Sequence, residues 1–110
     1  MSDEAKKNDD LKQRFDLIPP DALFEIAEVY TLGAKKYGDR NWQKGMRWGR
    51  TFSAIMRHLW AWLGGEDWDR ETGLSHLAHA AWGCLTLLAY SRRGLGVDDR
   101  KDDENGRQEE

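Results

Sequence analysis

The sequence is short of several features that usually identify the class of a protein. Its single cysteine, Cys84, excludes an internal disulfide, and because this residue falls in an apolar run we expect a buried structural thiol. No apolar run approaches the roughly 20 residues that a membrane-spanning helix needs. The polar first residues lack the apolar segment of a signal peptide. These absences predict a cytoplasmic protein with no membrane partner.

Common short motifs are absent as well. There is no Walker loop, no GxGxxG sequence, no CxxC pair and no His-Asp dipeptide of the kind that marks the HD class of metal phosphohydrolases. No segment shows the alternation of a half-buried strand, whereas several segments space their apolar residues as a helix does. The fold class is therefore predicted to be all-α.

The net charge of −3 combines two acidic ends with a basic middle. Residues 1–13 and 97–110 are polar and aperiodic, so we expect flexible tails there. The predicted domain, residues 14–96, carries 11 basic and 9 acidic residues, a net charge of +2, and its bases concentrate between Lys35 and Arg57. A local basic cluster beside acids suits an anionic small molecule held through a metal ion. A nucleic acid usually needs a broad basic face, so no stable nucleic-acid partner is expected.

Three segments combine helical spacing with a following glycine: residues 21–37, 52–63 and 74–93. Asp21 and Thr51 are the expected N-caps of the first two helices. The expected core faces are Leu23, Ile26, Ala27 and Tyr30 on the first helix, and Leu77, Ala80, Ala81, Cys84, Leu87 and Leu88 on the third. The second helix is apolar nearly all round. Three such helices make a thin core, which predicts a small helical bundle completed by oligomerisation, as a homodimer or homotetramer.

Two acids three residues apart, Glu25 and Glu28, lie on one face of the first predicted helix. At this spacing the two carboxylates can share one divalent ion, and one of them could instead act as a general base. The alternative is a solvated helix face whose acids pair with nearby lysines.

A second group of metal-ligating residue types follows the second predicted helix. His76 and His79 repeat the three-residue spacing, just after an acidic stretch that contains Glu66 and Asp69. Imidazole suits Mn²⁺, Zn²⁺ or Fe²⁺ better than Mg²⁺, which prefers oxygen ligands. The alternatives are hydrogen-bonded core histidines and an exposed acidic loop.

Residues with the chemistry to recognise a nucleotide are Lys35, Lys36, Asn41, Trp42, Arg57 and His58. The lysines can neutralise phosphate, the asparagine can pair with a base edge, and the tryptophan can stack on a base. The arginine and the histidine add donors. The same residues could instead be surface lysines, a core tryptophan and a buried structural histidine.

Two runs, RFDLIPPDAL…IAEVYTLGAKKYGDRNWQKG and MRHLWAWLGGEDWDRETGLSHLAHAAWG, together resemble the phage dATP/dGTP diphosphohydrolase family, of MazZ type, within the MazG-like all-α pyrophosphohydrolases. The resemblance spans roughly residues 14–90. It implies an oligomeric enzyme that uses Mg²⁺ or Mn²⁺ to hydrolyse a purine deoxynucleoside triphosphate, dGTP or dATP, to the monophosphate and pyrophosphate. For a phage protein it implies the host cytoplasm.

The MazG-like pattern has an ExxE pair on one helix and an ExxD pair on a later one. The first pair maps onto Glu25 and Glu28. The second maps onto His76 and His79 by position, or onto Glu66 and Asp69 by residue type, and both remain open at this point. The competing interpretation is a non-catalytic helical module that holds single-stranded nucleic acid or a nucleotide through its bases and aromatic residues.

Overall fold

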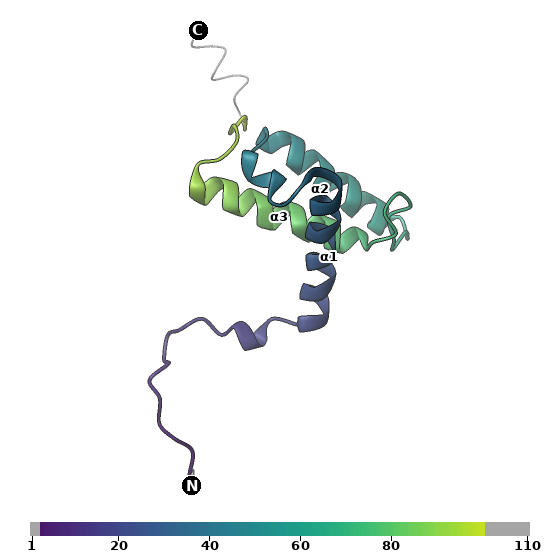
Figure 1. The fold of residues 1–110 in the computed structure, drawn as a ribbon. Helices are drawn as coiled ribbons and strands as arrows, with labels where there is room; N and C mark the ends of the chain where they lie inside the picture. Colours follow the sequence, from purple (N-terminus) through teal and green to yellow (C-terminus); the bar gives the residue numbers. More distant parts are fainter. Residues whose placement is uncertain (1–2, 101–110) are drawn as a thin grey trace.

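The computed structural model describes residues 3–100, and three helices make up most of this part of the chain (Figure 1). They are α1, Pro20–Tyr37; α2, Trp48–Leu63; and α3, His76–Arg93. α2 and α3 lie side by side in opposite directions, and α1 packs mainly on α3. Residues 3–100 contain two short 3₁₀ turns and no strand, which confirms the all-α prediction.

α1 begins at Pro20, one residue before the predicted cap, because a proline suits the first position of a helix, where its missing N–H is not needed. Pro20 takes that position, so Asp21 lies in the first turn instead of capping the helix, and its Oδ1 accepts a hydrogen bond from the N–H of Ala22 at 2.9 Å. Gly38 ends the helix at a φ of 98°, as predicted. The buried residue of α1 is Val29, outside the predicted stripe, while Leu23 of that stripe is exposed.

α2 begins at Trp48, four residues before the predicted start, because a segment after α3 covers its first turn. The carbonyl of Val97 accepts a hydrogen bond from the N–H of Trp48 at 3.0 Å, and Oδ1 of Asp99 accepts one from the N–H of Gly49 at 2.8 Å. Thr51, the predicted cap, is a buried residue within the helix. Part of the predicted C-terminal tail thus contacts α2, and residues 101–110 of that tail lie outside the described residues.

α3 begins at His76, where the hydroxyl of Ser75 caps the helix by accepting a hydrogen bond from the N–H of Ala78 at 3.1 Å. The face of α3 that packs inward carries mostly small or polar residues: His76, Ala80, Gly83, Thr86 and Tyr90. Gly83 lies directly against Ile55 of α2, and this close approach selects the face.

The predicted apolar face of α3 is wrong at several positions, because the helix turns its small residues toward α2. Leu77, Leu88 and Cys84 are exposed, so Cys84 is not the buried thiol expected from its neighbours. Phe52 and Trp60 of α2 are also more than half exposed. Within residues 3–100, no helix combines the length and the apolar character that crossing a membrane requires.

Candidate functional site

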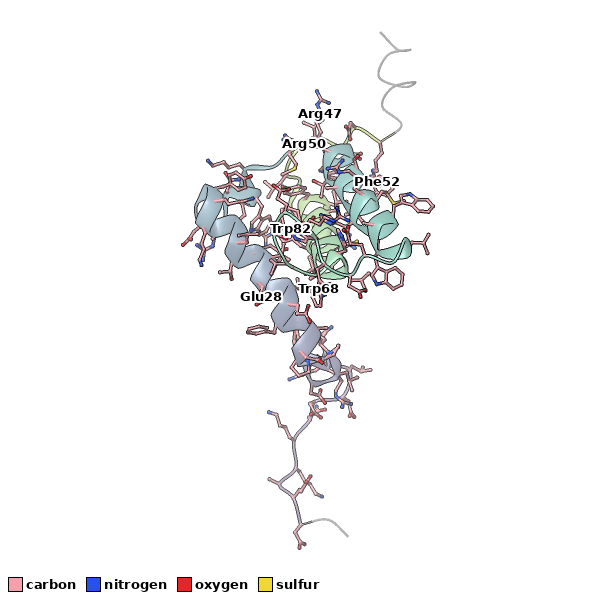
Figure 2. All side chains as sticks on the ribbon, turned by 90° about the vertical axis from the view of Figure 1, so that its right-hand side faces the viewer. Glu28, Arg47, Arg50, Phe52, Trp68 and Trp82 are labelled. Carbon is pink, nitrogen blue, oxygen red and sulfur yellow. The ribbon has the colours of Figure 1, made fainter. Side chains whose placement is uncertain are left out.

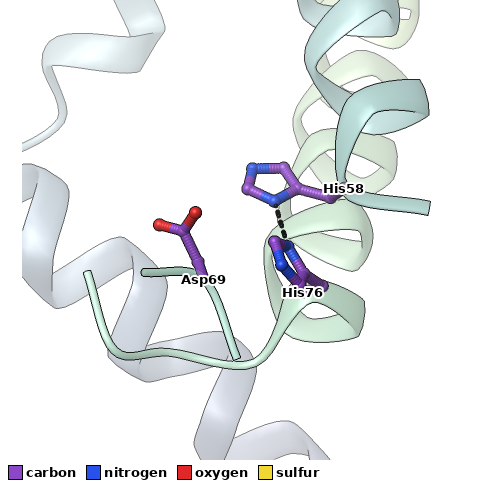
Figure 3. A group of neighbouring side chains, drawn as sticks. All are labelled: His58, Asp69 and His76. Atoms are coloured by element: carbon purple, nitrogen blue, oxygen red, sulfur yellow. Dashed lines mark hydrogen bonds between the residues drawn. The ribbon is translucent and has the colours of Figure 1, made fainter. Parts of the chain in front are cut away.

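The connection between α2 and α3 is a compact acidic turn that fixes the position of Asp69. The N–H of Asp69 donates to the carbonyl of Leu74 at 2.8 Å, and the N–H of Gly73 donates back to the carbonyl of Asp69 at 2.7 Å. Gly73 has a φ of 75°, a conformation that a side chain disfavours, so this glycine suits the turn. As a result the Asp69 carboxylate faces the histidines of the neighbouring helices (Figure 3).

Six polar side chains meet beside this turn and are called the histidine–carboxylate cluster below: His58, Glu66, Asp69, Thr72, His76 and His79. α2 supplies the first of them, α3 supplies the last two, and the turn supplies the other three. The structure therefore brings together predicted site residues that lie up to 21 positions apart in the sequence.

His76 is at the centre of the cluster and is 4% exposed. Its Nε2 lies 2.9 Å from Oε1 of Glu66, and its Nδ1 lies 2.9 Å from Nδ1 of His58. Glu66 also accepts a hydrogen bond from Nε of Arg70 at 2.7 Å. Because an ionised carboxylate can only accept, Nε2 of His76 carries its hydrogen, and the Nδ1 of a neutral ring presents its lone pair toward His58.

A second set of bonds orders Asp69 and His79 through Thr72. The Thr72 hydroxyl donates to Oδ2 of Asp69 at 2.8 Å, and the Thr72 N–H donates to the same oxygen at 3.0 Å. Since the hydroxyl has only one hydrogen, Nε2 of His79, 2.8 Å away, must donate to it. The ring of His79 stacks on that of His58, with centroids 4.4 Å apart and planes within 4°.

The electrostatics of the cluster favour neutral imidazoles beside ionised carboxylates. Burial lowers the pKa of His58 and of His79, and for His58 the adjacent His79 lowers it further. The hydrogen bonds from His76 and Arg70 hold the pKa of Glu66 below its usual value. Burial acts to raise the pKa of Asp69, but its bonds from Thr72 outweigh this effect and leave the pKa lowered. Neutral imidazole nitrogen and ionised carboxylate oxygen are the forms that bind metal ions.

Next to the cluster, a cavity of about 600 Å³ opens between α1, the 3₁₀ turn Asn41–Lys44 and α3. The aromatic residues that line it are Tyr30, Tyr37, Trp42 and Trp82, and its polar lining includes Lys36, Arg40, Asn41, Thr72 and His79. Trp42 is fixed in place because the hydroxyl of Tyr90 donates to its carbonyl at 2.7 Å. The cavity thus joins an aromatic wall to the edge of the histidine–carboxylate cluster.

A second cavity of about 390 Å³ contains the α1 acid Glu28, together with Lys35 and Thr72. Glu28 lies about midway along α1 (Figure 2). Thr72 lines both cavities, so it connects the α1 side chains with the cluster. Glu25 is partly exposed and lines neither of these two cavities.

The structure places two predicted substrate contacts, Arg57 and His58, outside both cavities, with His58 in the cluster, and it adds three residues. Arg57 is exposed, bonds to the hydroxyl of Ser53 at 3.1 Å and lines neither cavity. Sequence reasoning missed Thr72, Tyr30 and Trp82. The position of Thr72 within the acidic turn was a signal for the first, whereas the aromatic pair becomes visible only when α1 packs on α3, with ring centroids 5.9 Å apart.

Comparison with known proteins gives one family and one relative. A family model described as "dATP/dGTP diphosphohydrolase, N-terminal" matches residues 2–100. A protein of Salmonella phage PMBT28 named "dATP/dGTP diphosphohydrolase" is 38% identical over 95 residues, which cover 86% of this chain and 32% of that protein. The chain thus spans about a third of the length of this relative. No solved structure matches.

Proposed function

This chain belongs to the dATP/dGTP diphosphohydrolase N-terminal domain family, and from that premise we propose that it hydrolyses a purine deoxynucleoside triphosphate, dGTP or dATP, to the monophosphate and pyrophosphate in a metal-dependent reaction. The observation that carries the proposal is the cavity of about 600 Å³, whose lining combines an aromatic wall with Thr72 and His79 of the cluster. A nucleotide has the same two-part chemistry, with a flat base and an anionic phosphate chain.

The aromatic part of the cavity suits the base. Trp42 and Tyr30 meet edge to face with centroids 6.0 Å apart, and Trp82 continues the same wall. A purine stacked on this wall buries apolar surface, and the adjacent Asn41 has both a donor and an acceptor for a base edge. We therefore propose for Asn41 and Trp42 the role that the sequence suggested.

The basic and acidic residues suit the phosphate chain. Lys36 lines the first cavity, and Lys35 lines the second beside Glu28, so the two lysines can neutralise phosphate from neighbouring positions. Glu28 is proposed to accept a proton from a water molecule whose oxygen bonds to the α-phosphorus. The bond between the α-phosphorus and the bridging oxygen then breaks, and that oxygen leaves with the pyrophosphate.

Residues that would hold a divalent ion, Mg²⁺ or Mn²⁺, come from α1, the acidic turn and α3: Glu25, Glu28, Asp69, His76 and His79. Their oxygen and imidazole donors fit such an ion chemically. When bound, the ion would neutralise phosphate charge and lower the pKa of a water molecule. The ordered Asp69 carboxylate, with its lowered pKa, supports this assignment.

A second copy of this chain is the proposed partner of its exposed apolar surface. Leu77 and Leu88 of α3, Trp60 of α2 and Phe24 of α1 are each more than 40% exposed. Burying such residues in a homodimer or homotetramer would complete the thin core, as the family resemblance implies. Light scattering coupled to size-exclusion chromatography measures the assembly. In keeping with this function, we place the protein in the cytoplasm of a phage-infected host.

The decisive experiment is an assay of this chain with dGTP and dATP, with Mg²⁺ or Mn²⁺, that measures pyrophosphate and monophosphate separately. We expect both products in equal amounts, and we expect Glu28→Gln to reduce turnover by about 100-fold or more, because a general base contributes roughly 10²–10⁴-fold. Unchanged circular dichroism would show that the variant is folded.

Asp21→Asn is the matched control, since it removes another exposed carboxylate from α1 and should leave turnover unchanged. Full turnover in Glu28→Gln would contradict the assigned role. Salt-dependent binding of a labelled oligonucleotide without any hydrolysis of nucleotides would favour the alternative of a non-catalytic binding module.

A further inference from the structure

We infer that His58, Asp69 and His76 bind a divalent first-row transition-metal ion, with His58 acting as a metal ligand and Glu66 as a positioning residue for His76. The inference deepens the proposed function and depends on it only for what the ion is used for. It differs from the sequence-based assignment, which gave His58 to the substrate and left the ligand set after α2 open.

The three proposed ligands lie close enough together to share one ion. One ligand atom from each of His58, Asp69 and His76 lies within 4.8 Å of the other two (Figure 3). The two Nδ1 atoms of the histidines are 2.9 Å apart, which one shared proton or one cation can bridge. With metal–nitrogen bonds of about 2.0–2.1 Å, this separation corresponds to an angle of about 90° at the metal, as between neighbouring ligands of an octahedral ion.

The hydrogen bonds around His76 resemble those around a metal-binding histidine. Histidines that bind a metal usually donate their other N–H to a carboxylate or carbonyl, which fixes the ring and raises its basicity. His76 donates Nε2–H to Glu66, and Glu66 is itself held by Arg70. His76 therefore already has the hydrogen-bond partner that a metal-binding histidine usually has.

The carboxylate side has matching support. Both hydrogen bonds from Thr72 reach Oδ2 of Asp69, and within residues 3–100 no hydrogen bond reaches Oδ1. Oδ1 is therefore available to a cation while Oδ2 remains bonded to Thr72. An ionised Asp69 and a neutral His58 are the forms such a site needs, and the pKa of each group is shifted in that direction.

The ligand chemistry selects the class of ion. Two imidazoles and one carboxylate suit Mn²⁺, Fe²⁺ or Co²⁺, whereas Mg²⁺ prefers oxygen ligands and retains its waters. His79 stacks on His58 and also lines the nucleotide-sized cavity. The ring of His79 would therefore lie between an ion bound at His58 and the proposed nucleotide site.

The test is a Co²⁺ titration of the full chain, without a histidine tag and without nucleotide. Calorimetry gives the affinity, and NMR detects imidazole proton signals shifted by bound Co²⁺. We expect one ion per chain and shifted signals from two histidines, with the signals of one lost in His58→Gln. Glu66→Gln should weaken Co²⁺ binding about 10- to 100-fold, the usual effect of losing an outer-shell partner of a metal ligand.

Asp67→Asn is the control, because this exposed acid lies in the same turn but is not in the cluster, and the Co²⁺ affinity of this variant should match that of the unmodified chain. Because His76 is buried, Asp69→Asn provides a second, shape-conserving variant, which should also weaken binding. Circular dichroism verifies that each variant is folded.

Two results would overturn the inference: no shifted imidazole signals, or Co²⁺ binding that is lost in Glu25→Gln and Glu28→Gln but kept in His58→Gln. Pyrophosphate release with Mg²⁺ is measured in parallel. If hydrolysis persists without Co²⁺ binding at the histidines, this inference fails and the proposed function stands. If Co²⁺ binds as described but no nucleotide is hydrolysed, this inference stands and the proposed function fails.

Discussion

The histidine–carboxylate cluster and the acids of α1 both offer ligand atoms for a metal ion, but they differ in how firmly hydrogen bonds hold their side chains. In the cluster, every side chain is held by at least one other, and His76 and Asp69 are held from two directions. On α1, the side chains of Glu25 and Glu28 make no hydrogen bond or ion pair within residues 3–100. The cluster is therefore preorganised for a ligand, whereas no such bonds hold the two α1 acids within residues 3–100.

This difference follows from where each group lies in the fold. The cluster forms at the contact between α2 and α3, which approach closely because Gly83 faces Ile55. α1 contacts α3 near its middle, through the Tyr30 hydroxyl, which lies 3.1 Å from Oγ1 of Thr86. Ordered ligand atoms thus depend on tight helix packing, and that dependence can be tested.

The largest effect is expected from Gly83→Ala, which should affect the histidine–carboxylate cluster more than the acids of α1. A Cβ at this position would overlap Cγ1 of Ile55 and come within 2.9 Å of its Cδ1. Overpacking of this kind typically costs about 1–3 kcal/mol of unfolding free energy, and it should displace His58 from His76. Chemical denaturation measures the stability, and Co²⁺ titration measures the cluster.

Gly33→Ala on α1 is the matched control, since nothing lies within 4 Å of an added Cβ there. Alanine should stabilise that helix by about 0.5–1 kcal/mol. Equal effects of the two substitutions would show that the α2–α3 contact is not as tight as described.

A smaller effect is expected from Tyr90→Phe, which should alter the cavity and spare the cluster. Tyr90 is fully buried, and its hydroxyl donates to the carbonyl of Trp42. Loss of one buried hydrogen bond should lower the unfolding free energy by about 1 kcal/mol and weaken nucleotide binding, because Trp42 loses a fixed position.

Ser91→Ala, which removes an exposed hydroxyl on the same helix, should change neither quantity. A large loss of Co²⁺ affinity in Tyr90→Phe would mean that cavity and cluster are not independent.

The smallest effect on stability is expected from Arg70→Ala. The Arg70 side chain is 91% exposed, so its pair with Glu66 should contribute little to the unfolding free energy measured by denaturant. Co²⁺ affinity should fall less than in Glu66→Gln, because Glu66 still accepts from His76. A stronger loss in Arg70→Ala than in Glu66→Gln would contradict the proposed order of support.

Much of the helical architecture was predictable, because helix type and helix ends are encoded locally. Glycines at positions 38, 64 and 94 end the three helices where the sequence indicated. The helix starts were less accurate: α2 begins four residues early because a segment after α3 completes its first turn. That contact joins positions about 50 residues apart, so no local pattern reports it.

Side-chain burial on α3 was the least predictable feature. Ala80 is buried as predicted, but the predicted Leu77 and Leu88 are exposed, because the helix turns Gly83 toward α2, where a small residue allows the helix axes to approach. This rotation places His76 inside the protein and Cys84 on the surface. The same rotation decides which histidines meet.

The sequence by itself determined the helical class, most helix ends and the supply of acids, histidines and aromatic residues, because each depends on residue type and short-range spacing. Only the tertiary structure decided that His58 meets His76, that Thr72 joins Asp69 to His79, and that Trp42 faces a cavity near them. These contacts join residues on different elements, and their geometry is set by how closely the helices pack.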